Sequence, residues 1–316
     1  MNPILKELGF DAKDRVVIIH ADDIGMCQAT IPALADLLDF GLLSSAAVMV
    51  PCPWFLEAAA FCRDHPGIDM GVHLTVNAEW KNYRWGPIST RDSASGLLDE
   101  QGYFSPSPAV IEEQARPAAV ATEMRAQVAR AIQAGIDITH VDAHMGTVSR
   151  RPFRQAYIDV ALENRLPLPY IGRNANWLEN RRIPPTLIAH GAIRGGKLAI
   201  RGLPLLDAIA MLPLWDPNDH VGAARHIFDN LPPGLAVLIL HPAVDTPELR
   251  ALAPDWPSRV ANYAALLSHN LRDYIRQSGI QVIGYRPLRD LMRGGFEASN
   301  ELFLLDAGLG RAGSPP

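Results

Sequence analysis

Along the chain, segments with the apolar pattern of strands alternate with segments that have the apolar period of helices. Uninterrupted apolar runs at residues 16–19 and 235–240 are typical of strands buried on both faces. Further strands are expected at residues 43–50, 69–75, 139–145 and 280–285, with a short or irregular one at 166–171, where two prolines interrupt the run. Apolar residues at a helical period predict helices at residues 31–40, 54–63, 120–134, 153–164, 259–278 and 288–293.

Alternation of this kind implies a mainly parallel sheet with helices packed on it. Six or seven strand and helix units predict an α/β fold, a distorted (β/α) barrel of the TIM-barrel type with up to seven strands. A chain of 316 residues, 48% of them hydrophobic, has the material for such a core. We expect a single domain over residues 1–306 with long loop insertions, followed by a disordered tail over residues 307–316.

Two stretches break the alternation. Residues 79–117 lack periodicity and interleave aromatic residues with arginine. This suggests a loop over a binding site, and the alternative is a surface loop that folds around its own apolar cluster. We interpret residues 173–220, which hold several prolines, as a partly helical excursion that covers the site or contacts another subunit. The apolar run at residues 203–214 exceeds what an exposed excursion needs, which is consistent with a homodimer.

Charge and cysteine content narrow the class of protein. Twenty-nine basic and 34 acidic residues give a net charge of −5, which argues against a nucleic-acid-binding surface and fits a small substrate. Lys6 and Glu7 stand where a secretory signal would need an apolar core, and no later run has the length of a membrane span. We therefore expect a soluble, cytoplasmic protein without nucleic-acid or membrane partners. The three cysteines match no metal or redox spacing, which predicts reduced and mostly buried thiols.

Polar residues of metal-ligand type follow four of the predicted strands: Asp22 and Asp23, His73, His144, and His241. In the strand at 139–145, side-chain alternation places His140, Asp142 and His144 on one side. The carboxyl ends of barrel strands are where catalytic groups collect. Each residue alone has a structural explanation, such as a helix cap or a hydrogen-bonded histidine. Four strands that end in this way together predict one shared site.

The residue types indicate metal chemistry. Two imidazoles and one carboxylate leave open positions on a divalent cation, as in catalytic metal sites. Such an ion lowers the pKa of its water from about 16 toward about 7 and polarises a carbonyl, so an ester or amide can be hydrolysed. A second carboxylate can accept a proton, and an imidazole across the site can donate one to the leaving group.

Two other functions stay open. One is a metal-dependent phosphoesterase or sugar isomerase, although the motifs include no glycine-rich phosphate loop and no dense cluster of arginine and lysine. The other is a carbohydrate-binding protein that keeps the barrel without turnover.

Four ordered motifs carry a resemblance to a known family: residues 20–25 (HADDIG), 71–75 (GVHLT), 139–144 (THVDAH) and 240–242 (LHP). Their order and rough spacing are similar to those of the YdjC-like (ChbG/HpnK) carbohydrate deacetylases, from about residue 14 to about residue 290. The resemblance implies a distorted (β/α) barrel that removes acetyl from an N-acetylated sugar or oligosaccharide with one divalent metal ion, Mg²⁺ or Zn²⁺.

Roles for individual residues follow from this resemblance. Asp23, His73 and His144 would hold the metal. Asp22 would be the general base, and His241 would protonate the leaving amine. His140 and Asp142 would orient the metal ligands from behind. The expected substrate-binding residues are Thr75, Glu79, Trp80, Tyr83, Arg84 and Trp85.

Two details depart from the simplest form of this pattern. Strict strand alternation puts Asp22 and Asp23 on opposite sides, so we expect the chain to bend or bulge at this pair, helped by Gly25. Several family members carry additional histidines just after the position of His144, whereas Met145, Gly146 and Thr147 follow here.

Overall fold

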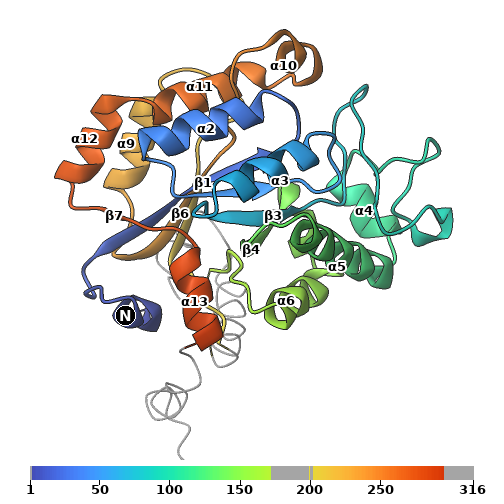
Figure 1. Ribbon diagram of the computed structural model, residues 1–316, viewed down its shortest axis with the longest axis horizontal. Helices are drawn as coiled ribbons and strands as arrows, with labels where there is room; N and C mark the ends of the chain where they lie inside the picture. Colours follow the sequence, from blue (N-terminus) through green and yellow to red (C-terminus); the bar gives the residue numbers. More distant parts are fainter. Residues whose placement is uncertain (1, 172–198, 200–201, 295–316) are drawn as a thin grey trace, which may run out of the picture.

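The computed structural model describes residues 2–171, 199 and 202–294. Their centre is a parallel sheet of seven strands, surrounded by helices (Figure 1). The strands are β1 (Arg15–Ile24), β2 (Ser45–Val48), β3 (Met70–Leu74), β4 (Ile138–Ala143), β5 (Ala208–Met211), β6 (Gly234–Leu240) and β7 (Gln281–Val282). Their order is β4-β3-β2-β1-β6-β5, and β7 pairs with the beginning of β1. The predicted α/β class and the number of strands are confirmed.

Helices connect the strands and cover the sheet. They are α1 (Pro3–Glu7), α2 (Thr30–Phe40), α3 (Phe55–Asp64), α4 (Pro108–Gln114), α5 (Pro117–Gln133), α6 (Arg154–Glu163), α9 (His220–Asp229), α10 (Pro247–Leu252), α11 (Trp256–Leu266), α12 (His269–Gln277) and α13 (Arg286–Gly294). Helices α2, α9, α11 and α12 gather on one side, while α5 and α6 pack together on another (Figure 1). Gly41 ends α2 in the left-handed conformation, at φ 77°, as its place after the last apolar residue predicts.

At one end of the strand order β4, and at the other end Leu206 just before β5, contact the stretch at residues 166–171. The amide of Val141 donates to the carbonyl of Pro167 at 3.0 Å, and the amide of Leu206 donates to the carbonyl of Tyr170 at 2.8 Å. Ile171 adds an isolated parallel bridge to Leu206. This stretch is irregular, as its prolines predict, and it lies where a closing strand would lie in a barrel.

The inner side of the sheet changes character along the strands. Val16 and Ile18 of β1 join a small apolar cluster with residues of α1, β6 and α13. His20, two residues further along the same side, begins a buried polar network. Because side chains alternate along a strand, Val17 and Ile19 point the other way, into the main core. The carboxyl end of β1 therefore places polar groups above an apolar base.

Several predicted elements differ from the structure. The apolar run at residues 203–214 contains β5 and buries Leu203, Leu206 and Leu212, so this part of the segment predicted to be partly helical is not a helix. Most of the predicted excursion, residues 173–198, lies outside the described residues. Because much of the run lies in the core, it does not support a homodimer. The long helix at 259–278 is two helices, since Ser268 caps a new one. The strand at 280–285 shrinks to β7, and the loop at 79–117 contains α4 and a short 3-10 helix.

Other predictions fall outside the described residues or agree with them. Residues 172–198 and the tail at 307–316 are not described. Cys27, Cys52 and Cys62 are buried free thiols, as predicted. None of the described helices has the length and apolarity to cross a membrane.

Candidate metal centre and active site

The carboxyl ends of the strands bring the predicted residues together. Asp22 and Asp23 lie at the end of β1, His73 on β3 and His241 directly after β6. His144 begins the turn that follows β4. All five side chains are buried, with at most 8% of their surface exposed. Parallel strands thus place groups that are distant in sequence at one edge of the sheet.

The expected bend at the aspartate pair is present. The pairing of β1 with β2 shifts in register between Ala21 and Ile24, and Asp23 adopts a left-handed conformation at φ 64°. The amide of Met26 donates to the carbonyl of Asp23 at 3.1 Å, which closes a turn there. Both carboxylates consequently reach the same site.

Asp23, His73 and His144 form a triangle of potential ligand atoms. Asp23 Oδ1 lies 3.3 Å from His73 Nε2 and 3.2 Å from His144 Nδ1. The two ring nitrogens are 3.2 Å apart. Asp23 Oδ1 is buried. It has no hydrogen-bond partner among the described residues, although the nitrogens of His73 and His144 are near.

Two carboxylates fix the orientation of the two imidazoles. His73 Nδ1 lies 2.8 Å from Asp142 Oδ1, and His144 Nε2 lies 3.0 Å from Glu79 Oε2. When each histidine donates its proton to its carboxylate, the other ring nitrogen turns a lone pair toward the triangle. Three electron-rich atoms then face one another in a buried place, which is unfavourable unless a cation lies between them.

The other oxygen of Asp23 is held by an arginine. Arg259 Nη1 of α11 donates to Asp23 Oδ2 at 2.7 Å, and its Nε donates to Asp255 Oδ1 at 3.0 Å. Arg259 has 3% of its surface exposed. Asp23 Oδ2 is therefore held by Arg259, and Oδ1 stays available to coordinate a metal ion.

The charges around the triangle favour a bound cation. Burial alone would lower the pKa of His73, but the carboxylates of Asp142 and Asp22 raise it well above its usual value. For His144, Glu79 and Asp23 outweigh burial and raise the pKa to about 9. Burial alone would raise the pKa of Asp23, but the Arg259 guanidinium and the imidazoles of His144 and His73 together hold it well below its usual value. The carboxylates that favour protonated imidazoles would equally favour a metal ion.

The triangle fits a small divalent ion. Tetrahedral ligands at about 2.0–2.1 Å from Zn²⁺ are roughly 3.3–3.4 Å apart, which agrees with edges of 3.2–3.3 Å. Two imidazoles and one carboxylate form a donor set that suits Zn²⁺ better than Mg²⁺, which prefers oxygen ligands. These three residues could hold such an ion.

Asp22 and His241 lie beside this triangle. Asp22 Oδ2 is 3.9 Å from His73 Nε2 and 3.7 Å from His241 Nε2. Both distances are too long for a hydrogen bond. Asp22 Oδ1 lies 2.9 Å from His20 Nε2 but forms no hydrogen bond, because that nitrogen is aligned with Asp142 Oδ2 instead. His241 Nδ1 has no partner among the described residues, and burial lowers the pKa of this histidine. Both groups therefore border the same space beside the triangle.

Asp142 and His140 occupy different places, although they share a side of β4. Asp142 lies directly behind His73, where a ligand-orienting group is expected. His140 is fully buried further down, stacked on Tyr285 with ring centroids 4.0 Å apart. A Cβ at Gly71 would lie 2.3 Å from its Nε2, so this nitrogen packs against backbone. His140 supports the base of the site and touches none of the three potential ligands.

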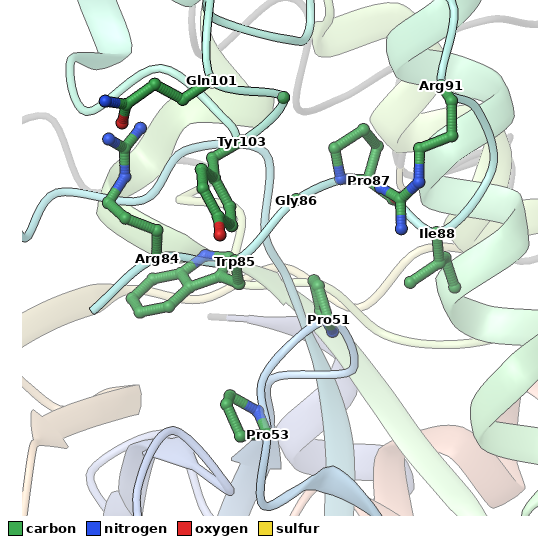
Figure 2. A pocket seen from close by; sticks show the side chains of 11 residues that line it. Pro51, Pro53, Arg84, Trp85, Gly86, Pro87, Ile88, Arg91, Gln101 and Tyr103 are labelled. Atoms are coloured by element: carbon green, nitrogen blue, oxygen red, sulfur yellow. The ribbon is translucent and has the colours of Figure 1, made fainter. Parts of the chain in front are cut away.

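The expected substrate-binding residues use most of their polar groups internally. Thr75 donates its hydroxyl to the carbonyl of His73, Tyr83 donates to that of Met26, and Trp85 Nε1 donates to that of Asn77. Trp80 packs under Arg259, and Glu79 binds His144. Of these six, Arg84 and Trp85 line a hollow of about 400 Å³ (Figure 2).

Arg259 and the contact of Glu79 with His144 are two features of the site that the sequence does not predict. An arginine within a helix usually faces solvent, so no local pattern singles out Arg259. The only hint in the sequence is that a charged residue, Arg259, lies among the apolar residues of α11. Glu79 is expected at the substrate because it begins the irregular, aromatic-rich stretch predicted to cover the site, and its distance to His144 is visible only in three dimensions.

Comparison with known proteins agrees with the motifs. The family model of YdjC-like proteins matches residues 16–277. A carbohydrate deacetylase of Thermus thermophilus is 33% identical over 269 residues, 85% of this chain and 92% of that protein. One of Thermoanaerobacter pseudethanolicus is 23% identical over 275 residues, 87% of this chain and all of that protein.

A solved structure agrees with the fold. The crystal structure of an Enterococcus faecalis protein described as a cellobiose-phosphate cleavage protein aligns with a TM-score of 0.73 at 21% identity. The alignment covers 87% of this chain and 99% of that one. Because the family match spans most of the chain, this protein belongs to the family of YdjC-like proteins.

Proposed function

We propose that this protein is a metal-dependent carbohydrate deacetylase that removes acetyl from an N-acetylated sugar or oligosaccharide. The proposal rests on one observation, the triangle of Asp23, His73 and His144 with a second carboxylate, Asp22, beside it. The relatives in Thermus and Thermoanaerobacter, which are named carbohydrate deacetylases, support the reaction and the substrate class.

Asp23, His73 and His144 would hold the divalent ion. When bound, such an ion polarises the acetyl carbonyl and lowers the pKa of a water molecule, which are the two requirements for amide hydrolysis near neutral pH. Asp142 and Glu79 keep the two imidazoles in the ligand orientation. Arg259 keeps Asp23 from rotating away.

Asp22 would act as the general base. Its Oδ2 lies on the site side, 3.9 Å from the ligand atom of His73, close enough to accept a proton from a water molecule between them. The Oδ1 atom rests against His20, whose imidazole lies between the carboxylates of Asp22 and Asp142. A fixed carboxylate loses little entropy when it takes the proton.

His241 would donate a proton to the leaving amine. Burial lowers its pKa, so its imidazolium form is a stronger acid than an exposed one. Its backbone amide donates to Asn262 Oδ1 at 2.9 Å, which fixes the chain at the end of β6. His241 Nε2 and Asp22 Oδ2 are 3.7 Å apart, so both groups can face the same bound amide.

The test combines metal content with product release. Purified protein should contain about one divalent ion per chain and release acetate from N-acetylated sugars, and a chelator should abolish this release. Asp22→Asn should keep the metal and lower turnover by roughly 10²–10⁴-fold, the range expected for loss of a general base. The exposed Asp64→Asn on α3 is the matched control and should retain activity. Full turnover in Asp22→Asn would contradict the assignment, and phosphate release without acetate would identify a phosphoesterase instead.

A further inference from the structure

His20 lies directly behind the proposed base. It is on β1, two residues before Asp22, and only 1% of its surface is exposed. Its Nε2 lies 2.9 Å from Asp22 Oδ1 and 2.9 Å from Asp142 Oδ2. The N–H is aligned with Asp142, while Asp22 Oδ1 has no hydrogen-bond partner among the described residues. One ring nitrogen therefore faces two carboxylates, neither of which belongs to the metal triangle.

The neighbours of His20 determine its protonation state. Its Nδ1 lies 3.1 Å from Ser45 Oγ, and this hydroxyl donates its hydrogen to Asp69 Oδ1 at 3.1 Å. A hydroxyl that donates its single hydrogen elsewhere can only accept from the imidazole. Because Nε2 faces carboxylate oxygens, which also accept, both ring nitrogens carry a hydrogen. In agreement, the carboxylates of Asp142 and Asp22 outweigh burial and raise the pKa of His20 to about 9.

The adjacent histidine of this network is uncharged. The rings of His140 and His20 have centroids 4.8 Å apart. Thr139 Oγ1 donates to Asp69 Oδ1 at 2.6 Å and therefore accepts from His140 Nδ1, at 3.0 Å. His140 Nε2 is buried without a partner in the described chain, and burial together with the charge of His20 lowers the pKa of His140 well below its usual value. Of these two rings, His20 is the one that carries the charge.

The charge of His20 offsets the repulsion between two buried carboxylates. Oxygens of Asp22 and Asp142 lie within 4.8 Å of each other. Two buried negative charges at this distance repel each other strongly, which would turn one side chain away from the other. Asp142 also orients His73, because its Oδ1 lies 2.8 Å from His73 Nδ1. The imidazolium of His20 thus stabilises the present orientation of both carboxylates.

We propose that His20 is a positioning residue of the reaction, a charged ring anchored by Ser45 that keeps Asp22 aimed at the site and, through Asp142, keeps His73 in its ligand orientation. The inference rests on the proposed function and extends it to a residue that is not hydrogen-bonded to any of the three potential metal ligands. Its N–H groups and its ring shape can be removed separately, which makes the role testable.

Two substitutions of His20 separate hydrogen bonding from shape. His20→Phe keeps a ring against His140 and Tyr285 but removes both N–H groups, whereas the amide of His20→Gln can donate to both carboxylates. With an N-acetylated sugar and Zn²⁺, kcat of His20→Phe should fall about 10–100-fold, as for other residues that hold the groups around a metal. KM should stay within about twofold, because a buried ring behind Asp22 does not bind substrate. His20→Gln should recover most of the lost kcat.

Ser45→Ala and Thr139→Val form a matched pair that leaves the ring of His20 in place. Both hydroxyls donate to Asp69 Oδ1, but of the two only Ser45 contacts His20. Ser45→Ala should lower kcat about threefold to tenfold, because a hydrogen bond that anchors the charged ring is lost. Thr139→Val should lower the unfolding temperature without a comparable loss of kcat. This pair decides the question if His20→Phe does not fold, and equal kcat in the pair would then overturn the positioning role.

Zn²⁺ affinity, measured by competition with a metal-binding dye, is a readout independent of turnover. It should fall about tenfold or more in His20→Phe, because Asp142 loses the donor that fixes it behind His73. It should stay near the wild-type value in His20→Gln and Thr139→Val.

The outcomes separate this role from the deacetylase proposal. Wild-type kcat in His20→Phe, or the same loss of kcat in His20→Phe and His20→Gln, would overturn the positioning role while leaving the deacetylase intact. If no N-acetylated sugar releases acetate, the deacetylase proposal fails and Zn²⁺ affinity decides about His20. Weaker binding in His20→Phe than in His20→Gln and Thr139→Val supports the role, and any other pattern, including no binding by the wild type, overturns it.

Discussion

Asp23 shows how much a single residue contributes to this site. Its left-handed backbone is strained for a residue with a side chain, at a cost of order 1 kcal/mol or more. Because of that conformation, two consecutive aspartates point into one space, where strict alternation would separate them. One oxygen of this carboxylate contacts Arg259, and the other faces His73 and His144 in the triangle. Strain at such a position is a common feature of functional sites.

Some residues of the site can be recognised from the sequence, and others cannot. His73, His144 and the aspartate pair were recognisable because metal-ligand types follow strands, and the need for a bend followed from alternation alone. Arg259 and the contact of Glu79 were not, because both depend on the distance between elements far apart in the chain. Aromatic residues at 80–85 resembled a binding surface, although most of their polar atoms are satisfied inside the loop.

Glu79→Gln tests the contact that sequence analysis missed. The amide keeps the size of the side chain but removes the charge that holds the proton on His144 Nε2. We expect metal affinity to fall about 10–100-fold, as for other partners of metal-bound histidines. Competition with a metal-binding dye measures this affinity without reference to activity. Glu57→Gln, exposed on α3, is the control, and equal affinity in the two variants would contradict a supporting role for Glu79.

At the scale of elements, the hydrophobic period identified most helices, and the errors came from local chemistry. The pattern at 259–278 runs through Leu267 without a visible break, since both helices that share it bury apolar residues at a helical spacing. Ser268 ends this continuity, because its side chain accepts from the amide of Leu271 and starts α12. Strand β5 was not predicted, because its four residues lie within the longer apolar run at residues 203–214 and are too few to distinguish from helix by period.

Ser268→Ala tests the importance of this helix start. Loss of an N-cap typically costs 0.5–2 kcal/mol, so we expect the free energy of unfolding to fall by about 1 kcal/mol. Urea unfolding followed by circular dichroism measures the change. Ser89→Ala is a suitable control, because the Ser89 hydroxyl is buried without a partner and its removal should cost little. A change no larger than that of the control would show that α12 starts without the cap.

At the scale of the whole molecule, the inner side of the sheet combines an apolar base with a polar top. Buried carboxylates and imidazoles at the top are stable only when their charges are balanced. His20 lies between the carboxylates of Asp22 and Asp142, and Arg259 neutralises part of Asp23. In the triangle, Asp23 Oδ1 is one of several buried polar atoms of this network without a hydrogen-bond partner among the described residues, and it faces two imidazole nitrogens. A bound cation should therefore stabilise the fold as well as support catalysis.

Metal binding should accordingly raise the unfolding temperature. A ligand that binds only the folded state at 100 times its dissociation constant adds about 2.7 kcal/mol of stability. For a chain of this size, that increment corresponds to a rise of several degrees. Calorimetry of chelator-treated protein, with and without added Zn²⁺, measures the shift. In His144→Gln, which removes one ligand of the triangle, the added ion should have a much smaller effect. The same shift in this variant would place the bound ion elsewhere, whereas no shift in either protein would show that these three side chains do not form a metal site.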